Sequence, residues 1–399
     1  MHNPRVDDLA DYPFDRLRAL LKDATPPAHL PPMVLSIGEP KHPAPDLLTE
    51  TLAANAHLWG RYPPTEGTPE LRAAIARWLT RRFGLAAGAP NAIDPETHVI
   101  SAAGTREALY MAAELATPER KNGARPAILM PTPYYHVYGG AAIMRGAEPV
   151  FLPATQATGF LPDLDAIPAD VWNRAALFYL CSPANPQGAV ASLDYLKRAV
   201  ALCRAHDVVL AADECYSEIY DEVPPAGALQ ACAALGGGFE NVLVFHSLSK
   251  RSSAPGLRSG FVAGDASLIA RFRRLRAYAG AALPMPIQAA SIALWSDEAH
   301  VERNRALYRA KFDLAGQILG NRFGFVRPGG GFYLWLDVGD GEKAARALWA
   351  EAGLRVLPGA YMSRATAGGA NPGAPYIRVA LVHDADATAE ALQRLVKVL

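Results

Sequence analysis

The 399-residue sequence has few cysteines, no excess charge of either sign and no long uninterrupted apolar run. Its four cysteines are too few for a disulfide framework and are not spaced as metal ligands, so we expect neither disulfides nor a bound metal. Thirty-nine basic residues balance thirty-nine acidic ones, and this balance argues against nucleic acid or another polyanion as a partner.

The absence of a long apolar run also argues against insertion into a membrane. The best candidate, residues 277–295, is interrupted by Pro284, Pro286 and Gln288, which lipid does not tolerate without internal hydrogen-bond partners. The chain begins Met1-His2-Asn3-Pro4 and lacks the basic and then apolar pattern of a secretory signal. We therefore expect a soluble, cytoplasmic protein with no membrane partner.

The sequence does contain a regular alternation of short aliphatic runs and longer helical patterns. This alternation predicts an α/β protein with a mostly parallel central sheet covered by helices on both faces. The expected strands are residues 97–100, 126–130, 177–181, 208–212, 242–245 and 260–263. The expected helices include residues 106–115, 193–205 and 268–277. The pattern places a large α/β domain at residues 53–282.

A different pattern follows residue 282. The expected elements there are a long helix near residues 301–319 and strands near residues 332–336, 355–356 and 377–381. We therefore predict a small α+β domain over residues 283–399. Residues 1–52 should contribute to this small domain and to a substrate loop, with an irregular proline-rich stretch at residues 26–32. Residues 365–375 are rich in Gly, Ala and Pro and predict a loop.

A lysine stands just past the end of one predicted strand. Ser247-Leu248-Ser249-Lys250 follows the strand at 242–245, and Gly256-Leu257-Arg258-Ser259-Gly260 comes shortly after it. The carboxyl ends of parallel strands are where open α/β sheets bind ligands. Taken alone, Lys250 would more often be a surface cation, so its neighbours decide the interpretation.

Three other strand ends also carry polar groups. Asp213 ends an apolar strand, and a buried carboxylate needs a partner such as a protonated ring nitrogen unless it only caps the next segment. Asn185-Pro186 follows another strand and is also ordinary turn chemistry. Gly104-Thr105-Arg106 opens a helix after a third, where free amides suit a phosphate, although a simple capped helix has the same pattern. Together the four offer a lysine, an acid, polar donors and a phosphate cradle, which enzymes that use pyridoxal phosphate (PLP) need.

This combination resembles the fold-type I PLP-dependent aminotransferases of the aspartate aminotransferase superfamily, over nearly the whole chain. The resemblance is carried, in order, by Asn185, Asp213, Tyr216, Lys250, Arg258 and Arg378. It implies that PLP is carried on Lys250 as a Schiff base and that the freed lysine amine moves the proton during catalysis. It also implies that Asp213 pairs with the ring nitrogen, while Tyr216 and Asn185 hydrogen-bond the phenolic oxygen of the ring.

Further cofactor contacts follow from the same resemblance. The phosphate is expected to bind Ser247, Ser249, Arg258 and the Gly104-Thr105-Arg106 turn. Tyr135, or else Tyr134 beside it, matches the aromatic side chain that stacks on the cofactor ring, although core packing would also explain either. Tyr62 looks like the tyrosine that reaches the phosphate of the neighbouring subunit, although it would otherwise be a surface-turn residue. The match of Tyr62 implies a homodimer with shared active sites.

The resemblance also implies where the substrate binds. Arg378 matches the family arginine that grips the substrate α-carboxylate, because its guanidinium fork suits a bidentate contact. Gly38, within Ser36-Ile37-Gly38-Glu39-Pro40, resembles the glycine whose amide meets the same carboxylate, and Asn185 is expected to join this contact. An arginine on an edge strand would otherwise be solvated. The expected substrates are a small-molecule amino acid and an oxo acid.

Four segments narrow the substrate by resemblance. They are residues 12–18, 38–42, 104–109 and 213–220. All four are similar to bacterial succinyldiaminopimelate aminotransferases, which implies glutamate-dependent amination of N-succinyl-2-amino-6-oxopimelate in the biosynthesis of diaminopimelate and lysine. Lys41, His42 and Arg106 are then expected to bind the distal carboxylates of that substrate.

Other functions fit parts of the same pattern. One is another class I/II aminotransferase that uses aspartate, alanine or an aromatic donor, and another is a C–S lyase of the same fold. A PLP-binding regulator would need a fused DNA-binding module, and neither the short N-terminal segment nor the neutral charge supplies one.

Overall fold

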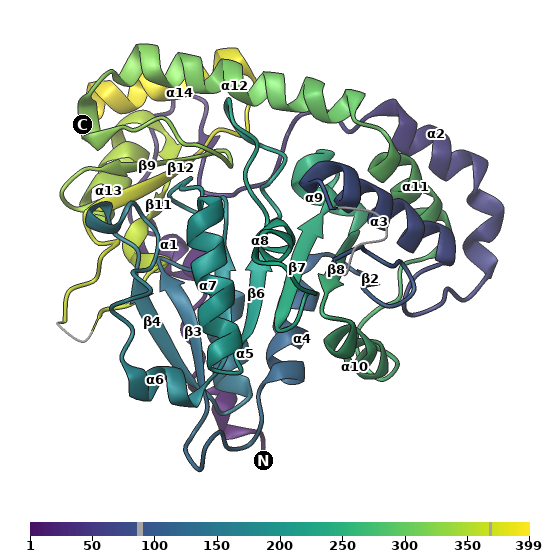
Figure 1. Cartoon of the computed structure of the whole chain (residues 1–399). Helices are drawn as coiled ribbons and strands as arrows, with labels where there is room; N and C mark the ends of the chain where they lie inside the picture. Colours follow the sequence, from purple (N-terminus) through teal and green to yellow (C-terminus); the bar gives the residue numbers. More distant parts are fainter. Residues whose placement is uncertain (86–90, 367–368) are drawn as a thin grey trace.

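A computed structural model of the chain describes residues 1–85, 91–366 and 369–399, and a seven-stranded sheet forms the centre of these residues (Figure 1). In spatial order its strands are β2 (Val99–Ala102), β8 (Gly260–Gly264), β7 (Val242–Ser247), β6 (Val209–Asp213), β5 (Ala175–Cys181), β3 (Ala127–Thr132) and β4 (Glu148–Pro153). β8 runs antiparallel to β2 and β7, and the other neighbouring strands are parallel. The predicted mostly parallel sheet is thus confirmed.

Helices cover both faces of this sheet, because the side chains of each strand alternate between two buried clusters. In β5, Phe178 and Leu180 belong to one cluster, whereas Leu177 and Tyr179 belong to the other. The first cluster includes α3 (Pro69–Phe83), α6 (Ala169–Arg174), α7 (Leu193–Ala205), α8 (Ala228–Leu235) and α11 (Met285–Ser296). The second includes α4 (Thr105–Ala116), α5 (His136–Met144) and α10 (Ala266–Arg276). In Figure 1, α7 and α8 lie in front of the sheet, and α4 and α5 lie behind it.

A smaller group of strands and helices is built mainly from the C-terminal part of the chain. Its antiparallel sheet has the order β11 (Leu357–Pro358), β12 (Tyr376–Ala380), β9 (Tyr333–Asp337), and β1 (Met33–Val34) pairs in parallel with β10 (Leu354–Arg355). The helices that pack there are α1 (Pro13–Leu20), α13 (Gly341–Ala352) and α14 (Ala385–Val398). Arg378 lies on β12, the middle strand, so it is not the solvated arginine of an edge strand. The domain limits near residues 52 and 282 stay a prediction.

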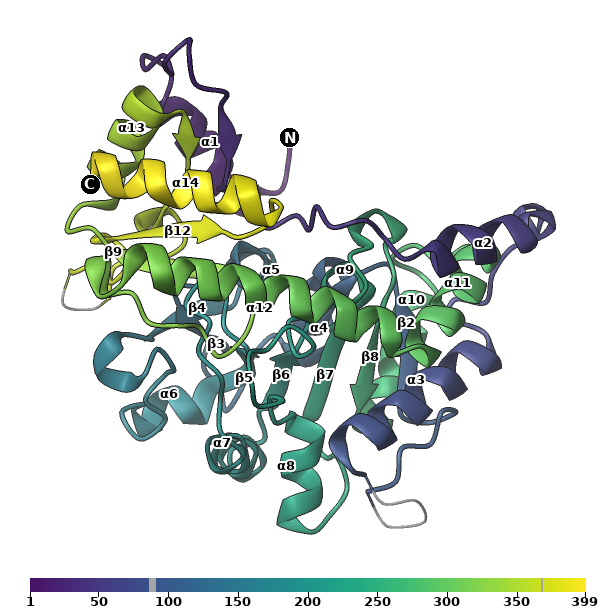
Figure 2. The ribbon, with the colours of Figure 1, turned by 90° about the horizontal axis from the view of Figure 1, so that it is seen from above.

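One long helix connects the two parts of the molecule. α12 (Ala299–Leu319) runs from α11 to the small sheet, where it packs beside α14 (Figure 2). α2 (Asp46–Ala54) packs on α11 at the other end, and α9 (Leu248–Arg251) directly follows β7. Side chains along α12 therefore contact both the central sheet region and the small sheet.

The structure differs from the sequence prediction mainly at element ends. The sequence does not predict β4, because Pro149 and Pro153 lie within it, and the sheet tolerates them because β4 is an edge strand. β2 begins at Val99, since the amide of His98 is bound in a turn to the carbonyl of Asp94 (2.9 Å). β10 ends at Arg355, so residue 356 is outside the strand predicted at 355–356, and α10 ends one residue before 277.

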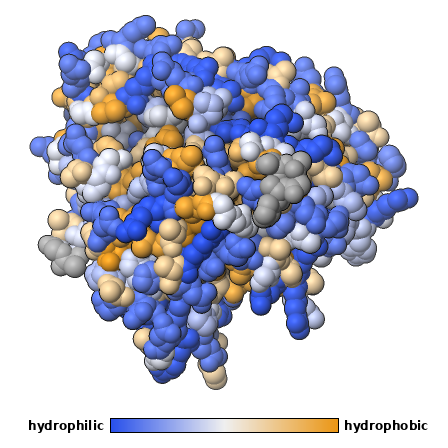
Figure 3. All heavy atoms as spheres, viewed as in Figure 1, coloured by the Kyte–Doolittle hydropathy of each residue, from blue (hydrophilic) through white to orange (hydrophobic). Residues whose placement is uncertain are grey.

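The loop predicted at residues 365–375 lacks helix and strand in its described part, and residues 367 and 368 lie outside the described residues. The four cysteines, all within the described chain, are free as expected. Among the described residues no helix combines the length and apolar character needed to cross a membrane. The face drawn in Figure 3 is mostly hydrophilic, with hydrophobic residues scattered over it.

Candidate active site

One cavity of about 590 Å³ collects most of the predicted site residues. It lies where β5, β6 and β7 end near β12 and the loop around Gly38. From the predicted set it is lined by Gly38, Thr105, Arg106, Tyr135, Asn185, Asp213, Tyr216, Ser247, Ser249, Lys250, Arg258 and Arg378. Gly104 adjoins Arg258, whereas Tyr62 is fully exposed and outside this cavity.

Lys250 comes from α9, the short helix after β7. The hydroxyl of Ser247 accepts a hydrogen bond from the amide of Ser249 (3.1 Å) and so caps the start of this helix. The amine of Lys250 donates to the carbonyl of Gly38 and lies 5.2 Å from the ring centroid of Phe332. Burial lowers the pKa of Lys250 to about 8, which increases the neutral fraction of the amine at physiological pH. The neutral amine is the form that attacks a carbonyl or accepts a proton.

Asp213 ends β6 inside the cavity wall. The buried hydroxyl of Tyr138 donates to its Oδ2 (2.6 Å), and the amide of Cys215 donates to its Oδ1 (3.4 Å). Burial raises the pKa of Asp213 while the bond from Tyr138 lowers it, so this hydrogen bond favours the carboxylate form. The sequence prediction missed Tyr138. Its only signal was a position one helical turn beyond Tyr134 in an aromatic segment.

A hydrogen-bonded set of polar side chains crosses the cavity. The amide nitrogen of Asn185 donates to the hydroxyl of Tyr216 (3.5 Å), which also lies 3.1 Å from the hydroxyl of Tyr333. The amide oxygen of Asn185 accepts from the guanidinium of Arg378 (3.0 Å). Asn185 therefore connects the hydroxyl of Tyr216 with the guanidinium of Arg378 on β12. Tyr333 was also missed, because a tyrosine inside a predicted strand has no local mark of a site.

Arg378 is buried, with 4% of its surface exposed. It donates to the carbonyl of Ser36 (2.5 Å) and lies 4.4 Å from the ring centroid of Tyr333. In the described chain this guanidinium makes no ion pair, and a buried charge without a counter-ion is costly. An anionic ligand group would supply the missing partner. Gly38 sits against the hydroxyl of Tyr333, so a residue with a Cβ at this position would have to displace the ring of Tyr333.

The donors at the start of α4 form a cradle for an anion. Gly104 precedes the helix with a φ of +82°, and a Cβ added there would lie 2.5 Å from the guanidinium of Arg258. The hydroxyl of Ser247 donates to that of Ser249 (2.9 Å) at the same end of the cavity. Unpaired amides at a helix N-terminus, a guanidinium and hydroxyls are the donors that a phosphate requires.

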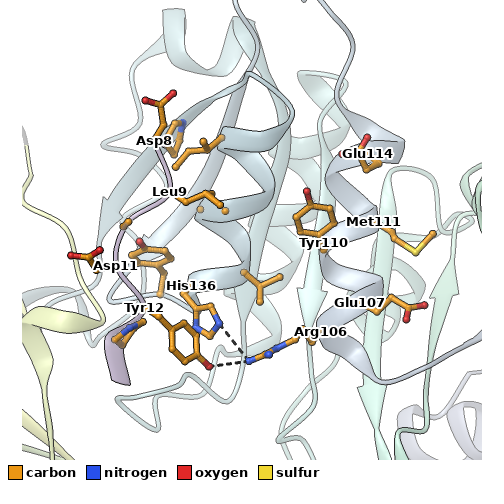
Figure 4. Close-up of a pocket in the computed structure, with 18 of the residues that line it drawn as sticks. Asp8, Leu9, Asp11, Tyr12, Arg106, Glu107, Tyr110, Met111, Glu114 and His136 are labelled. Carbon is orange, nitrogen blue, oxygen red and sulfur yellow. Dashed lines mark hydrogen bonds between the residues drawn. The ribbon is translucent and has the colours of Figure 1, made fainter. Parts of the chain in front are cut away.

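Arg106 stands at the junction of this cavity with a second one, of about 830 Å³. Its guanidinium donates to the hydroxyls of Tyr135 (2.9 Å) and Tyr12 (3.3 Å) and lies 3.5 Å from Nε2 of His136. Burial, with Arg106 and Arg378 nearby, lowers the pKa of His136 to about 4, so His136 is neutral near pH 7. Figure 4 shows the second cavity between α4 and the N-terminal segment, with Arg106 pointing toward Tyr12 and His136.

Two of the residues expected to bind distal carboxylates point elsewhere. Nζ of Lys41 lies 3.4 Å from Nε2 of His383, and Lys41 does not line the cavity. Both ring nitrogens of His42 contact internal groups, on Asn304 (2.9 Å) and Lys311 (2.7 Å). Of the three expected residues only Arg106 faces a ligand space, because the ring of His42 turns inward to Asn304 and Lys311, while the exposed side chain of Lys41 points toward His383.

The chain belongs to the family of class I and II aminotransferases, whose model matches residues 31–395. It is 37% identical over 391 residues to the 4-dedimethylamino-4-oxo-anhydrotetracycline transaminase OxyQ of Streptomyces rimosus, covering 97% of this chain and 99% of that one. It is 32% identical to the LL-diaminopimelate aminotransferase of Desulforudis audaxviator, covering 98% and 96% of the two chains.

Solved structures agree with this assignment. An aminotransferase of Neisseria meningitidis superposes with a TM-score of 0.94 at 42% identity, covering 99% of each chain. The aminotransferase AspB of Helicobacter pylori gives a TM-score of 0.88 at 37% identity, covering 98% of each chain. The fold-type I prediction is confirmed, and the family is PLP-dependent.

The residues in the cavity fit this cofactor. A reactive lysine, a buried carboxylate and an anion cradle lie around one space, at Lys250, Asp213 and the Gly104–Arg258 contact. Bound PLP supplies a ring that takes up electrons from the substrate, and the protein supplies orientation and charge around it. The protein is therefore a PLP-dependent aminotransferase.

Proposed function

We propose that this aminotransferase transfers the amino group of glutamate to N-succinyl-2-amino-6-oxopimelate, in the cytoplasm, as a step of diaminopimelate and lysine biosynthesis. One observation carries the proposal: the cavity holds both Lys250, whose burial lowers its pKa to about 8, and the guanidinium of Arg378, which forms no ion pair with any described residue. A neutral amine and a carboxylate-binding fork in one space are what an α-amino acid substrate needs.

We assign to the residues around the cofactor space the roles that the family resemblance implies. Lys250 would hold PLP, and its Nζ would afterwards accept and return the substrate proton. Asp213 keeps the ring nitrogen protonated, and Tyr138 supports it by donating to Oδ2. Tyr216 and Asn185 would hydrogen-bond the phenolic oxygen of the ring. The phosphate would be held by the backbone at the start of α4, at Gly104, Thr105 and Arg106, and by the side chains of Ser247, Ser249 and Arg258.

The stacking aromatic is assigned to Tyr135. Tyr134 also borders the cavity, but its ring packs 5.0 Å from that of Phe151, lies against Gly139 and belongs to a buried hydrophobic cluster. Tyr135 lines the cavity and is oriented by its hydrogen bond from Arg106. The α-carboxylate of the substrate binds Arg378, Asn185 and the amide of Gly38.

The distal carboxylate of the substrate is assigned to Arg106. This side chain borders both cavities, and the second cavity leaves room for a substrate longer than glutamate. A second candidate substrate is diaminopimelate without the succinyl group, which is favoured by the 32% identity to enzymes named LL-diaminopimelate aminotransferases. The two differ in the charge at the far end, where succinylation replaces an amine by an acid.

The deciding experiment is a donor panel with 2-oxoglutarate as acceptor, read out by glutamate formation. Succinylated diaminopimelate should give the highest kcat/KM among diaminopimelate, aspartate, alanine and aromatic amino acids. A higher value for free diaminopimelate or for an aromatic donor would reassign the substrate. Release of pyruvate and ammonia without an oxo acid would identify a C–S lyase instead.

Arg106→Ala tests the distal contact. KM for the succinylated substrate should rise far more than KM for glutamate, because glutamate is shorter and its side chain does not extend to the distal contact at Arg106. Lys41→Ala is the matched control, since Lys41 carries the same charge but lies outside the cavity. An equal rise for both substrates would remove Arg106 from this role.

We also propose a homodimer with shared active sites. Tyr62 is fully exposed in a single chain, as a side chain that completes a neighbour's phosphate site would be. Mixing Tyr62→Ala with Lys250→Ala should restore part of the activity, because one site of each mixed dimer has both residues intact. No restoration in a sample shown by light scattering to contain mixed dimers would exclude sharing.

A further inference from the structure

A buried lysine outside the cavity has no evident structural need. Lys311 lies on α12 with 1% of its surface exposed, and its amine donates to the carbonyl of Leu381 (2.9 Å). The same amine lies 2.7 Å from Nε2 of His42. Within the described chain no carboxylate forms an ion pair with it, so its burial is destabilising by itself. A function is therefore needed to account for it.

The hydrogen bonds that start at Lys311 run in one direction only. Nδ2 of Asn304 donates to the carbonyls of Lys250 (3.1 Å) and Arg251 (3.2 Å), which can only accept. The amide oxygen of Asn304 must therefore face Nδ1 of His42 (2.9 Å), and Nδ1 must carry the proton. Nε2 of His42 is then the acceptor for Lys311. We call this chain of hydrogen bonds, from Lys311 through His42 to Asn304, the relay. The neighbouring groups decide which atom carries the proton in each of its hydrogen bonds.

The two ends of the relay are the two sides of the active site. Leu381 directly follows β12, the strand that carries Arg378. The other end is the backbone carbonyl of Lys250 itself. Asn304 and Lys311 lie two turns apart on the same face of α12, and Tyr308 between them packs 4.6 Å from the ring of His42.

We propose that Lys311, His42 and Asn304 are positioning residues that hold the backbone of Lys250 in register with the carboxylate-binding strand of Arg378. The inference rests on the roles proposed above for Lys250 and Arg378. The backbone of Lys250 and the strand of Arg378 are thus linked through the fixed donors and acceptors of the relay. An error of about 1 Å between two catalytic elements is enough to lower a rate strongly.

A structural role and a positioning role predict different results for Lys311→Met. Methionine fills a similar volume and removes the buried charge, which offsets the loss of the donor to His42 and Leu381, so the free energy of unfolding should change little. The relay loses its first donor, and kcat/KM should fall about three- to tenfold, the effect of one net hydrogen bond. Lys121→Met is the matched control, because Lys121 is also largely buried and donates to backbone carbonyls, at His206 (3.1 Å) and Asp207. This control should leave kcat/KM unchanged.

Asn304→Asp tests the direction of the relay. The carboxylate keeps the shape of the amide but cannot donate to the two carbonyls, so its effect on kcat/KM should be at least as large as that of Asn304→Ala. A role in packing alone predicts the opposite order. His42→Gln keeps one donor and one acceptor, so it should recover part of the activity lost in His42→Ala. This comparison tests the relay if Asn304→Asp does not fold.

Two measurements other than turnover report on Lys250: the reactivity of its amine and the absorbance of the PLP bound to it. In the cofactor-free protein, Lys311→Met and Asn304→Asp should change the rate at which acetic anhydride labels Lys250 at pH 8, measured by peptide mass. In the holoenzyme the same variants should shift the pH midpoint of the visible absorbance of lysine-bound PLP. Unchanged labelling and absorbance in folded variants would overturn the proposal. Full turnover by Lys250→Ala would instead overturn the proposed function, which keeps the two failures distinct.

Discussion

The hydroxyl of Tyr138 lies 2.6 Å from Oδ2 of Asp213, and both groups are buried. The ring of Tyr138 also stacks on Tyr179 at 4.4 Å with an angle of 8° between the planes. The carboxylate that faces the cofactor space is thus oriented from behind by a rigid aromatic pair.

Tyr138→Phe should weaken this arrangement without opening the core. Removal of the hydroxyl leaves Oδ2 of Asp213 without its donor, and hydrogen bonds to charged groups contribute about 1.5–3 kcal/mol. We expect kcat/KM to fall about ten- to a hundredfold in steady-state assays. Tyr179→Phe is the control, since its hydroxyl donates only to the carbonyl of Leu109 (2.6 Å). If both variants lose activity equally, the stack and not the hydrogen bond matters.

Gly104→Ala should lower the affinity for PLP. The backbone at Gly104 has a φ of +82°, and the new Cβ would meet the Arg258 guanidinium at 2.5 Å. Equilibrium dialysis of the cofactor measures the effect. Gly123→Ala is the control that separates backbone strain from the clash with Arg258. Gly123 has a similar φ of +78°, but no heavy atom lies within 4 Å of the added Cβ. Equal loss in both variants would mean that strain alone is responsible.

The lowered pKa of Lys250 predicts a particular pH dependence in the cofactor-free protein. Only the neutral amine reacts with an acylating reagent, so labelling of Lys250 should rise through a midpoint near pH 8. An ordinary lysine side chain, with a pKa of about 10.4, would give a midpoint more than two units higher. Peptide mass spectrometry from about pH 6 to 11, the range in which lysines titrate, measures the labelling of Lys250 and of ordinary lysines in the same sample. A midpoint near 10 would show that the amine is not desolvated.

Arg378→Lys should reduce binding of every amino acid and oxo acid substrate alike. Lysine keeps the charge but loses the planar fork that reaches Asn185 and a carboxylate together. The loss of one charge-assisted contact should raise KM about ten- to a hundredfold for donor and acceptor. An effect on one substrate only would place Arg378 at a distal group instead.

The sequence predicts the strands that are buried on both faces more reliably than the others. Residues 193–205 form the helix expected there, and Asp213 and Lys250 lie at the strand ends where ligands bind. β4 escapes detection because its prolines resemble a turn, and an edge strand needs no amide at those positions.

The contacts around the site are less predictable, because they depend on distant elements. Tyr138, Tyr333 and Asn304 carry no local pattern, and each meets its partner only after the chain has folded. His42 illustrates the opposite error. Its place in a loop near Gly38 favours a substrate contact, but the fold turns its ring toward α12.

The reversed direction of β8 has a consequence for synthesis on the ribosome. Ser247 at the end of β7 pairs with Gly260 at the start of β8, a local hairpin that places Lys250 and Arg258 in the same short connection. β2 finds its only sheet neighbour in β8, since Ala102 pairs with Gly260 in the described sheet. A nascent chain that has not passed Gly264 therefore has no place to dock β2. The proposed phosphate site at Gly104 can therefore be assembled only after more than half of the protein has emerged.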